Sequence, residues 1–367
     1  MHNSDVNKSQ VRYEYLDVAR GISILLIVLG HTGFIGEFWL NFIYYINVPI
    51  FFILTGILAE IRDLRALDTK GMKNFLVKRF ENLMIPYAAF SVIYSIIYFV
   101  QMKMGYMTGE DFLKNIRRAL DFYGESVLWF LPTLFLAQAG FLVVGKLVRG
   151  LMLLWVSLLL GLSAAFSYRA IPEQGFGIGP AGDVLLDIFV LILRSLVALS
   201  FVAIGAFGYK YIISRIKAEK VLSRLLFWAA GIGFLLLAVL ITGFGSKVDL
   251  RDMKLGKILI YYLQGITGSA GILSISVSIR KFAPLSFFGR NSVTVMCTHL
   301  DCYVMYGAIQ LAWIVDSVVT RAKSYVFNLV IMITVILAEI IIIYLVNTFL
   351  PFLVGKRYKK LKSKSQK

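Results

Sequence analysis

Apolar stretches long enough to cross a bilayer follow one another along the chain, and short segments rich in Lys and Arg separate them. A helix needs about 20 apolar residues to span the hydrocarbon core. The fifth stretch is short, so a re-entrant segment is an alternative there. The first follows a polar leader without a cleavage pattern, so we do not expect a signal peptide. The pattern predicts ten spans, at about residues 18–36, 40–60, 83–102, 127–146, 151–167, 184–209, 225–244, 258–279, 292–313 and 325–350.

The predicted fold is all-α: a polytopic membrane protein with about ten transmembrane helices in one bundle. We expect a cytoplasmic leader of residues 1–16, a transmembrane domain of residues 17–352 and a basic cytoplasmic tail of residues 353–367. Composition agrees, since 59% of the 367 residues are hydrophobic, only 16% are charged and the mean hydropathy is +0.77. These values exclude a soluble globular domain.

Positive charge is distributed unevenly between the two sides of the predicted membrane. Most of the 38 Lys and Arg residues lie on the side of the two termini, which places both termini in the cytoplasm. The net charge of +17 follows from this topology and from contact with anionic membrane lipids, so no nucleic-acid partner is expected. The two cysteines stand five residues apart on one predicted helix and cannot pair, and no His/Cys cluster indicates a metal site.

The first span carries the most informative polar residues of the chain. Arg20 and His31 are eleven residues apart, which is about three helical turns, so they project from nearly the same face about 16 Å apart. Asp17 lies on the same stripe. Burying such groups in lipid is costly, so we expect them to face a protein interior or a wet cavity and to form a site. The alternative is that His31 only packs or hydrogen-bonds against a neighbouring helix.

Two further segments carry patterned charge. Residues 103–126 form the longest outer loop, and their pattern predicts an amphipathic helix at the outer surface. Asp183, Asp187 and Arg194 share one face of the sixth span, where an internal ion pair is the interpretation we favour.

Five short motifs follow one another along the chain: residues 15–20 followed by His31, residues 49–56, residues 79–87, residues 128–131, and residues 288–292 followed by His299. In this order and spacing they resemble the acyltransferase 3 family of membrane acyltransferases. The branch that the chain resembles most is that of fucose 4-O-acetylases, and the resemblance runs from Tyr15 to about residue 350. One departure is Asn82, which stands where the family often has the second Arg of an Arg-x-x-Arg pair.

The resemblance implies transfer of an acyl group, most often acetyl, from cytoplasmic acyl-CoA to a hydroxyl of a cell-surface or lipid-linked carbohydrate. The protein would then lie in a bacterial inner (plasma) membrane, with acetyl-CoA as donor, a carbohydrate or glycolipid as acceptor and no metal. Neutral imidazole suits the base that such a reaction needs, and a cation can stabilise the oxyanion. We therefore expect His31, Arg20 and Asp17 in catalysis, and Arg20, Lys78, Arg79 and Arg290 at the CoA phosphates.

Other positions of the motifs are expected near the substrate, namely Trp129, Thr55, His299 and Asn291. For His299 a plain helix–helix hydrogen bond is an equal alternative. For Trp129 the usual explanation is anchoring at the membrane interface. Neither direct transfer nor a covalent acyl-His intermediate is favoured by the sequence. The competing function is a proton-coupled transporter or flippase for a glycan or lipid-linked intermediate, because buried charges also form relays in carriers. The lack of sequence-related halves argues against it.

Overall fold

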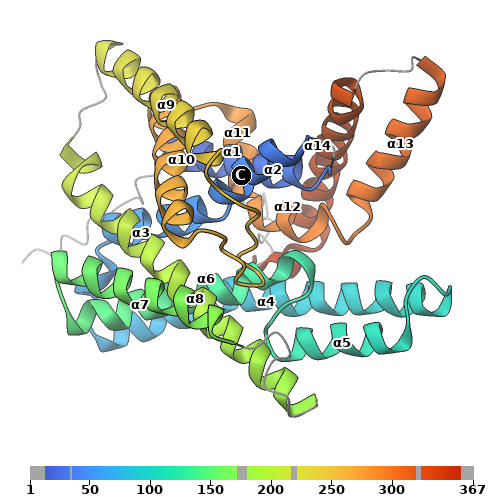
Figure 1. Ribbon diagram of the computed structural model, residues 1–367, viewed down its shortest axis with the longest axis horizontal. Helices are drawn as coiled ribbons and strands as arrows, with labels where there is room; N and C mark the ends of the chain where they lie inside the picture. Colours follow the sequence, from blue (N-terminus) through green and yellow to red (C-terminus); the bar gives the residue numbers. More distant parts are fainter. Residues whose placement is uncertain (1–12, 34, 172–179, 216–220, 320–323, 357–367) are drawn as a thin grey trace, which may run out of the picture.

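The computed structural model describes residues 13–33, 35–171, 180–215, 221–319 and 324–356 (Figure 1). Most of the predicted leader and tail lie outside these residues. Four short 3-10 helices join the α-helices: η1 (Leu64–Ala66), η2 (Ser126–Trp129), η3 (Ile213–Arg215) and η4 (Pro351–Val354). The α-helices are α1 (Glu14–Gly30), α2 (Glu37–Ile46), α3 (Pro49–Ile61), α4 (Thr69–Lys103), α5 (Gly109–Leu120), α6 (Phe130–Leu147), α7 (Leu151–Arg169), α8 (Pro180–Tyr211), α9 (Val221–Thr242), α10 (Ile258–Ile279), α11 (Ala283–Arg290), α12 (Ser292–Thr298), α13 (Val304–Val319) and α14 (Ser324–Phe349).

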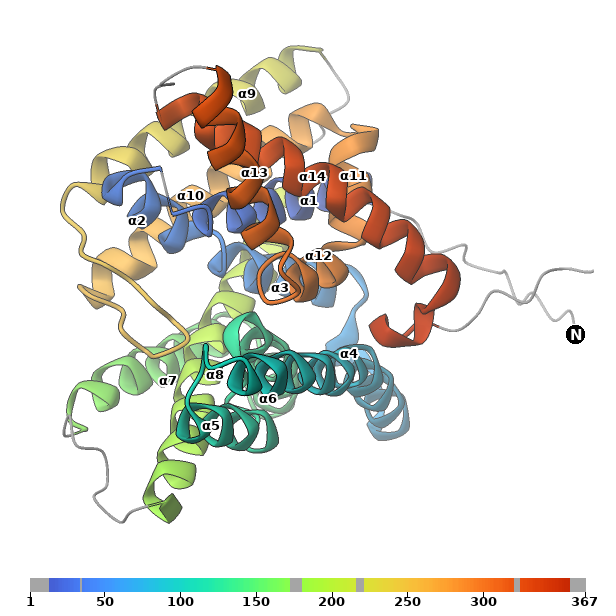
Figure 2. The same ribbon diagram turned by 90° about the vertical axis from the view of Figure 1, so that its right-hand side faces the viewer.

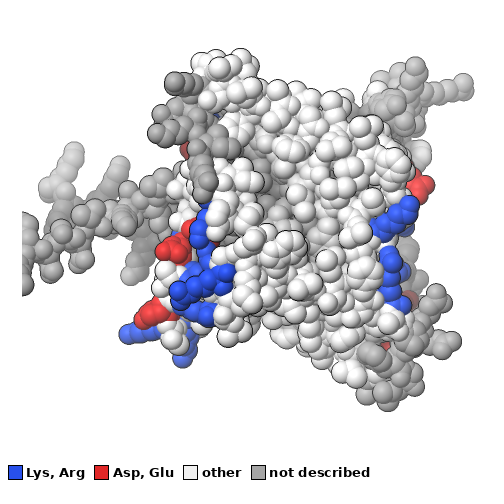
Figure 3. Space-filling view, turned by 60° about the vertical axis from the view of Figure 1, so that its left-hand side comes forward, with Lys and Arg blue, Asp and Glu red and all other residues white. Residues whose placement is uncertain are grey.

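Eight helical segments in the described part of the chain are long and apolar enough to cross a membrane. Figure 3 shows Lys and Arg gathered at two opposite edges of one face, with a broad surface free of charged side chains between them. Such an uncharged band is what a lipid-facing surface requires. The protein is therefore an all-helical polytopic membrane protein, as the sequence predicts.

Three of the ten predicted spans differ from the structure in an informative way. The first ends at Gly30 rather than at residue 36, so α1 has only 17 residues. The second is divided into α2 and α3 by a break at Asn47 and Val48, and Pro49 occupies the first turn of α3. The ninth is not continuous, because α12 ends at Thr298 and α13 begins only at Val304. All three breaks lie at or beside polar residues. A hydropathy value averaged over a whole span hides such single polar residues.

Other predictions are confirmed. The short fifth span is α7, a continuous helix of 19 residues and one of the eight candidate spans, which fits a span rather than a re-entrant segment. The predicted amphipathic helix is α5, which starts at a Thr108 cap whose hydroxyl accepts from the backbone N–H of Asp111. Its Phe112 packs edge-on against Phe99 of α4.

The helices form two groups. In Figure 1, α4 to α8 occupy the lower part of the molecule, and α9 to α14 lie above them together with α1 and α2; the turned view in Figure 2 shows the same division. Helix α3 joins the groups by packing against α8, and a Cβ at Gly56 would collide with the carbonyl of Val202. Glycine lets the two backbones approach this closely.

The alternation of the helices defines two sides. We call the side on which α3 ends and α4 begins the termini side, because η4, the last described helix, also packs against the first half of α4. The opposite side, the far side, carries α5, the start of η2 and the connection between α9 and α10. The sequence predicts that the termini side is cytoplasmic.

Candidate active site

His31 is the first residue after α1. The helix ends because the chain turns at residues 31–33, where Gly33 has a φ of +77°. The backbone N–H of His31 still bonds to the carbonyl of Ile27, so the imidazole is held at the end of a rigid helix. The chain then returns as α2 and α3, which form one wall of the space in front of the ring.

His299 meets His31 from the other end of the sequence. It follows α12 at the break before α13, where Tyr303 has a φ of +61° and the backbone N–H of Met305 bonds to the carbonyl of His299. Nε2 of His299 lies 3.1 Å from Nδ1 of His31, and the His299 side chain is fully buried. A hydrogen bond thus joins the two histidines that the sequence analysis selected separately.

The surroundings of His299 determine where the protons of the pair lie. Nδ1 of His299 is 2.8 Å from the carbonyl oxygen of Val295 and 3.1 Å from that of Met296, and carbonyl oxygens only accept hydrogen bonds. In neutral rings Nδ1 of His299 therefore carries the proton and Nε2 accepts one from Nδ1 of His31. This arrangement leaves Nε2 of His31 with its lone pair, which is the form that a general base requires.

A cavity of about 190 Å³ lies in front of His31, and we call it the histidine cavity. Its walls come from the end of α1, the α2–α3 break, η2 with the start of α6, the chain near α12, and the α9–α10 connection. Its lining includes Tyr44, Asn47, Phe51, Ser126, Trp129, Phe130, Asp249, Arg251 and Met296. The cavity is much smaller than the roughly 300–1,000 Å³ of a typical drug-sized ligand pocket, so it suits one ring or a short acyl group.

One wall of the cavity was not anticipated from the sequence. Residues 243–257 connect α9 to α10, and we call them the far-side loop; Asp249 and Lys254 pair in it through two backbone hydrogen bonds of 2.8 Å. The hydroxyl of Tyr45 donates to the carbonyl of Ser246 and accepts from its N–H, and Arg194 donates to the carbonyl of Arg251. The loop is therefore fixed to α2 and α8. Its composition alone gives no signal of these contacts.

The ion pair expected within the sixth span, between Arg194 and the aspartates of the same helix, is not what the structure has. The two aspartates of that span pair instead with Arg117 of α5, which lies 3.2 Å from Asp183 and 3.2 Å from Asp187. Arg194 bonds to the carbonyls of Tyr123 and Arg251 and sits over the Trp129 ring at 5.3 Å. It therefore holds together two segments beside the cavity.

Arg20 and Asp17 do not line the histidine cavity. They form an ion pair of 3.8 Å near the start of α1, toward the termini side. Arg79 of α4 lies close enough for the charges of Arg20 and Arg62 to act on it, and we call these three the inner basic group. Nε of Arg79 is buried and has no hydrogen-bond partner among the described residues. This Nε–H is therefore available to an anion that approaches the group.

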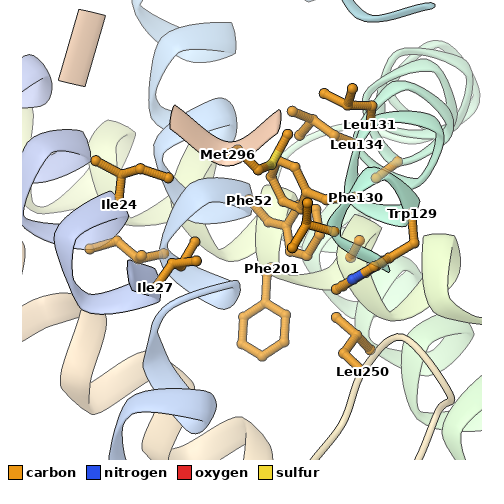
Figure 4. Packing of buried hydrophobic residues seen from close by; sticks show 14 of the residues in the cluster. Ile24, Ile27, Phe52, Trp129, Phe130, Leu131, Leu134, Phe201, Leu250 and Met296 are labelled. Carbon is orange, nitrogen blue, oxygen red and sulfur yellow. The ribbon is translucent and has the colours of Figure 1, made fainter. Parts of the chain in front are cut away.

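Apolar side chains fill the space between the inner basic group and His31. Ile24 and Ile27 of α1 are buried, and Figure 4 shows them beside Met296 and Phe52, with Trp129 on the other side. The two ends of the predicted Arg-x10-His site are thus on one helix, about 16 Å apart along its axis, and belong to different environments.

The remaining predicted residues lie in other places. Trp129 lines the cavity, whereas Lys78 and Arg290 are exposed. The Thr55 hydroxyl bonds to the carbonyl of Phe51 in its own helix. Asn291 accepts from Asn347 at 3.0 Å and from Lys356 at 3.2 Å, so the structure places it with the last helix and not at the cavity.

A glycine explains why the motif around Asn291 nevertheless affects the site. Helix α1 packs closely on α11, and a Cβ at Gly289 would collide with the carbonyl of Asp17. The late Gly-Arg-Asn-Ser segment therefore sets the position of the helix that carries Asp17, Arg20 and His31.

Two carboxyl groups lie buried beside the far-side end of the cavity. Glu125 precedes η2 and is 1% exposed, and Asp301 accepts from the Tyr98 hydroxyl at 3.0 Å. Burial, with the charge of Asp301, raises the pKa of Glu125 to about 8, and burial raises the pKa of Asp301 as well. In the part of the chain that the structure describes, no group of three His, Cys, Asp or Glu residues could hold a metal ion.

Comparison with known proteins places the chain in a family. No curated protein and no solved structure matches it. A family model described as an acyltransferase domain matches residues 13–355, which includes α1 with its Arg20 and His31, His299 and every helix between them. The chain thus belongs to the acyltransferase 3 family.

Proposed function

We propose that this membrane acyltransferase moves an acetyl group from acyl-CoA on the termini side to a hydroxyl of a carbohydrate that reaches the histidine cavity, with His31 as general base. The observation that carries the proposal is the His31–His299 hydrogen bond at the cavity, which leaves Nε2 of His31 as a proton acceptor. Family membership supports the reaction class.

The inner basic group suits the donor. CoA carries several phosphate charges, and arginine binds phosphate through paired, charge-assisted hydrogen bonds. The Nε–H of Arg79, which is buried and has no hydrogen-bond partner within the described residues, and the nearby charges of Arg20 and Arg62 offer such binding groups at one end of α1. Exposed Lys78 and Arg290 are further candidates on the same side. The acyl-bearing arm of CoA would run along α1 toward His31, so the side chains of Ile24 and Ile27 must move out of its path when it binds.

The chemistry balances without a metal. Nε2 of His31 takes the proton of the acceptor hydroxyl while the hydroxyl oxygen bonds to the thioester carbonyl carbon. The carbon–sulfur bond then breaks, and the CoA thiolate leaves with the proton returned by the imidazolium. The positive charge of Arg251 at the cavity wall favours the oxyanion that forms between the two steps. A bacterial inner membrane would supply both the cytoplasmic donor and an envelope glycan.

The test is transfer of radiolabelled acetyl from acetyl-CoA to the host glycolipid fraction, in membranes that contain equal amounts of each protein. Wild type should label the glycolipid, and the rate of labelling by His31→Ala should be at least about 10²-fold lower. His2→Ala, which removes the only other histidine besides His299, is the matched control and should keep the wild-type rate. Equal labelling by wild type and His31→Ala would overturn the proposed base.

A further inference from the structure

We infer that the histidine cavity is a binding site for one hydroxyl-rich ring of the acceptor, held by Asn47 and Arg251 and entered from the far side. The inference rests on the proposed function and adds the residues that recognise the acceptor. Neither residue belongs to a motif that pointed to the family, and neither was selected from the sequence.

Asn47 is the polar residue at the break between α2 and α3. It is 3% exposed and lines the same cavity as His31. Its backbone N–H bonds to the carbonyl of Ile43, but its side-chain oxygen is buried and has no hydrogen-bond partner among the described residues. Buried amide groups are nearly always satisfied, so this one is arranged for a partner that the chain itself does not supply.

Arg251 provides the complementary group from another part of the cavity lining. It belongs to the far-side loop, which Tyr45 and Arg194 fix in place, and its Nε is buried without a hydrogen-bond partner in the described chain. Its backbone N–H bonds to the carboxylate of Asp249, which also lines the cavity. The carboxylate of Asp252 lies 3.9 Å from this Nε, which is an ion pair but too long for a hydrogen bond, so the N–H is still available to a hydroxyl.

The two side chains together select a class of ligand. An amide oxygen without a donor and a guanidinium N–H without an acceptor are both satisfied by hydroxyl groups, which donate and accept. Trp129 adds an aromatic wall of the kind that packs against the apolar face of a ring. An acyl chain would leave the amide oxygen of Asn47 without a hydrogen bond, and the CoA phosphates would be repelled by the carboxylate of Asp249. A sugar ring satisfies all three side chains.

The position of these residues gives the direction of entry. Arg251 and Asp249 lie on the far-side loop, and Ser126 and Trp129 lie in η2, which begins on that side. The inner basic group lies at the other end of α1. Donor and acceptor would thus reach His31 from opposite sides of the membrane.

Kinetics separate acceptor binding from the chemistry of the donor. Wild type should hydrolyse acetyl-CoA slowly without acceptor, in a reaction that His31→Ala abolishes. Asn47→Ala should keep that hydrolysis but lose at least tenfold in transfer to the glycolipid fraction, through a higher KM for glycolipid. Asn115→Ala, on α5 and away from the cavity, is the control and should match wild type.

Transfer by Asn47→Ala at the wild-type rate, or hydrolysis that falls in parallel with transfer, would overturn the inference. Hydrolysis that does not depend on His31 would instead contradict the proposed function, so the two failures can be told apart.

Labelling tests the direction of entry without any activity. Asn47→Cys, in a background with Cys297→Ser and Cys302→Ser, should react with a membrane-impermeant maleimide added outside intact cells. Lys78→Cys, exposed near the start of α4, should react only after the membrane is opened. If Asn47→Cys were protected until the membrane was opened, entry from the far side would be wrong.

Discussion

At the scale of single residues, the site depends on which nitrogen of each histidine carries a proton. Two backbone carbonyls hold the proton of His299 on Nδ1, and His299 in turn directs the proton of His31 to Nδ1. In the proposed reaction, His299 is thus a positioning residue that acts through His31. Orientation of a base by a hydrogen-bonded neighbour is a general device of acyl transfer.

His299→Ala should lower the rate of acetyl transfer by about 10²-fold, because His31 loses the acceptor that fixes its tautomer. His299→Gln should recover part of the rate, since an amide oxygen can accept from Nδ1 of His31. The measurement is kcat at saturating acetyl-CoA, with protein amounts matched. Equal rates for His299→Ala and wild type would show that the contact is only structural.

Glu125 predicts a dependence of stability on pH. Its pKa in the folded protein is about 8, above the ordinary value of 4.5, so the folded state binds the proton more tightly than the unfolded state between these values. The free energy of unfolding should therefore fall as the pH rises from about 4.5 to about 8. Thermal unfolding in detergent at pH 6 and pH 8.5 measures this, and Glu125→Gln should reduce the difference. An unchanged difference in Glu125→Gln would contradict the assignment.

The sequence allowed part of the site to be predicted at this scale. Arg20, Asp17 and His31 were selected because charge on an apolar helix is costly, and Trp129 and His299 through the resemblance; three of these five line or adjoin the cavity. Asn47 and Arg251 could not be selected, because an Asn between apolar residues and an Arg in a polar loop are ordinary in sequence. Only the packing of α2, α3 and the far-side loop brings these two side chains to the same cavity.

At the scale of elements, the breaks in helices determine the site. His31 follows the end of α1, Asn47 separates α2 from α3, and His299 lies between α12 and α13. Polar backbone freed by such a break must be satisfied by protein or water, so in a membrane protein it is found where it lines a cavity. Hydropathy predicted most spans well, and α10 to the residue, but all three of these breaks fall inside spans that it predicted as continuous helix.

Gly289→Ala should destabilise the protein by about 1–3 kcal/mol, because the new methyl group collides with the carbonyl of Asp17 and pushes α1 away from α11. Gly307→Ala, in α13, is the matched control, since a Cβ there meets nothing within 4 Å. The midpoint of thermal unfolding in detergent should fall for the first variant only. A similar midpoint for both would contradict the close packing of α1 on α11.

At the scale of the whole molecule, α1 connects two different chemical environments. The inner basic group lies toward the termini side, and the histidine cavity lies toward the far side, with buried apolar side chains between them (Figure 4). The distribution of Lys and Arg and the spacing of Arg20 and His31 indicate the same polarity. The sequence could not predict that Ile24 and Ile27 fill the space between, because that depends on helices distant in sequence.

Arg20→Ala and Asn47→Ala should affect different substrates. Loss of Arg20 removes a charge for the CoA phosphates and should raise the KM for acetyl-CoA about tenfold or more, with little change for the acceptor. Asn47→Ala should do the reverse. Initial rates with each substrate varied in turn give both constants. Parallel changes in both KM values for both variants would contradict two separate sites on α1.

The most direct test of the account is the sidedness of the reaction in sealed inverted membrane vesicles, where the predicted cytoplasmic side faces outward. Radiolabelled acetyl-CoA is added outside, and labelled glycolipid is then treated with an impermeant esterase before and after the vesicles are opened. The account predicts ester that resists the enzyme until the vesicles are opened, and no labelled ester with His31→Ala. Ester that is removed at once, or that forms equally with His31→Ala, would contradict it.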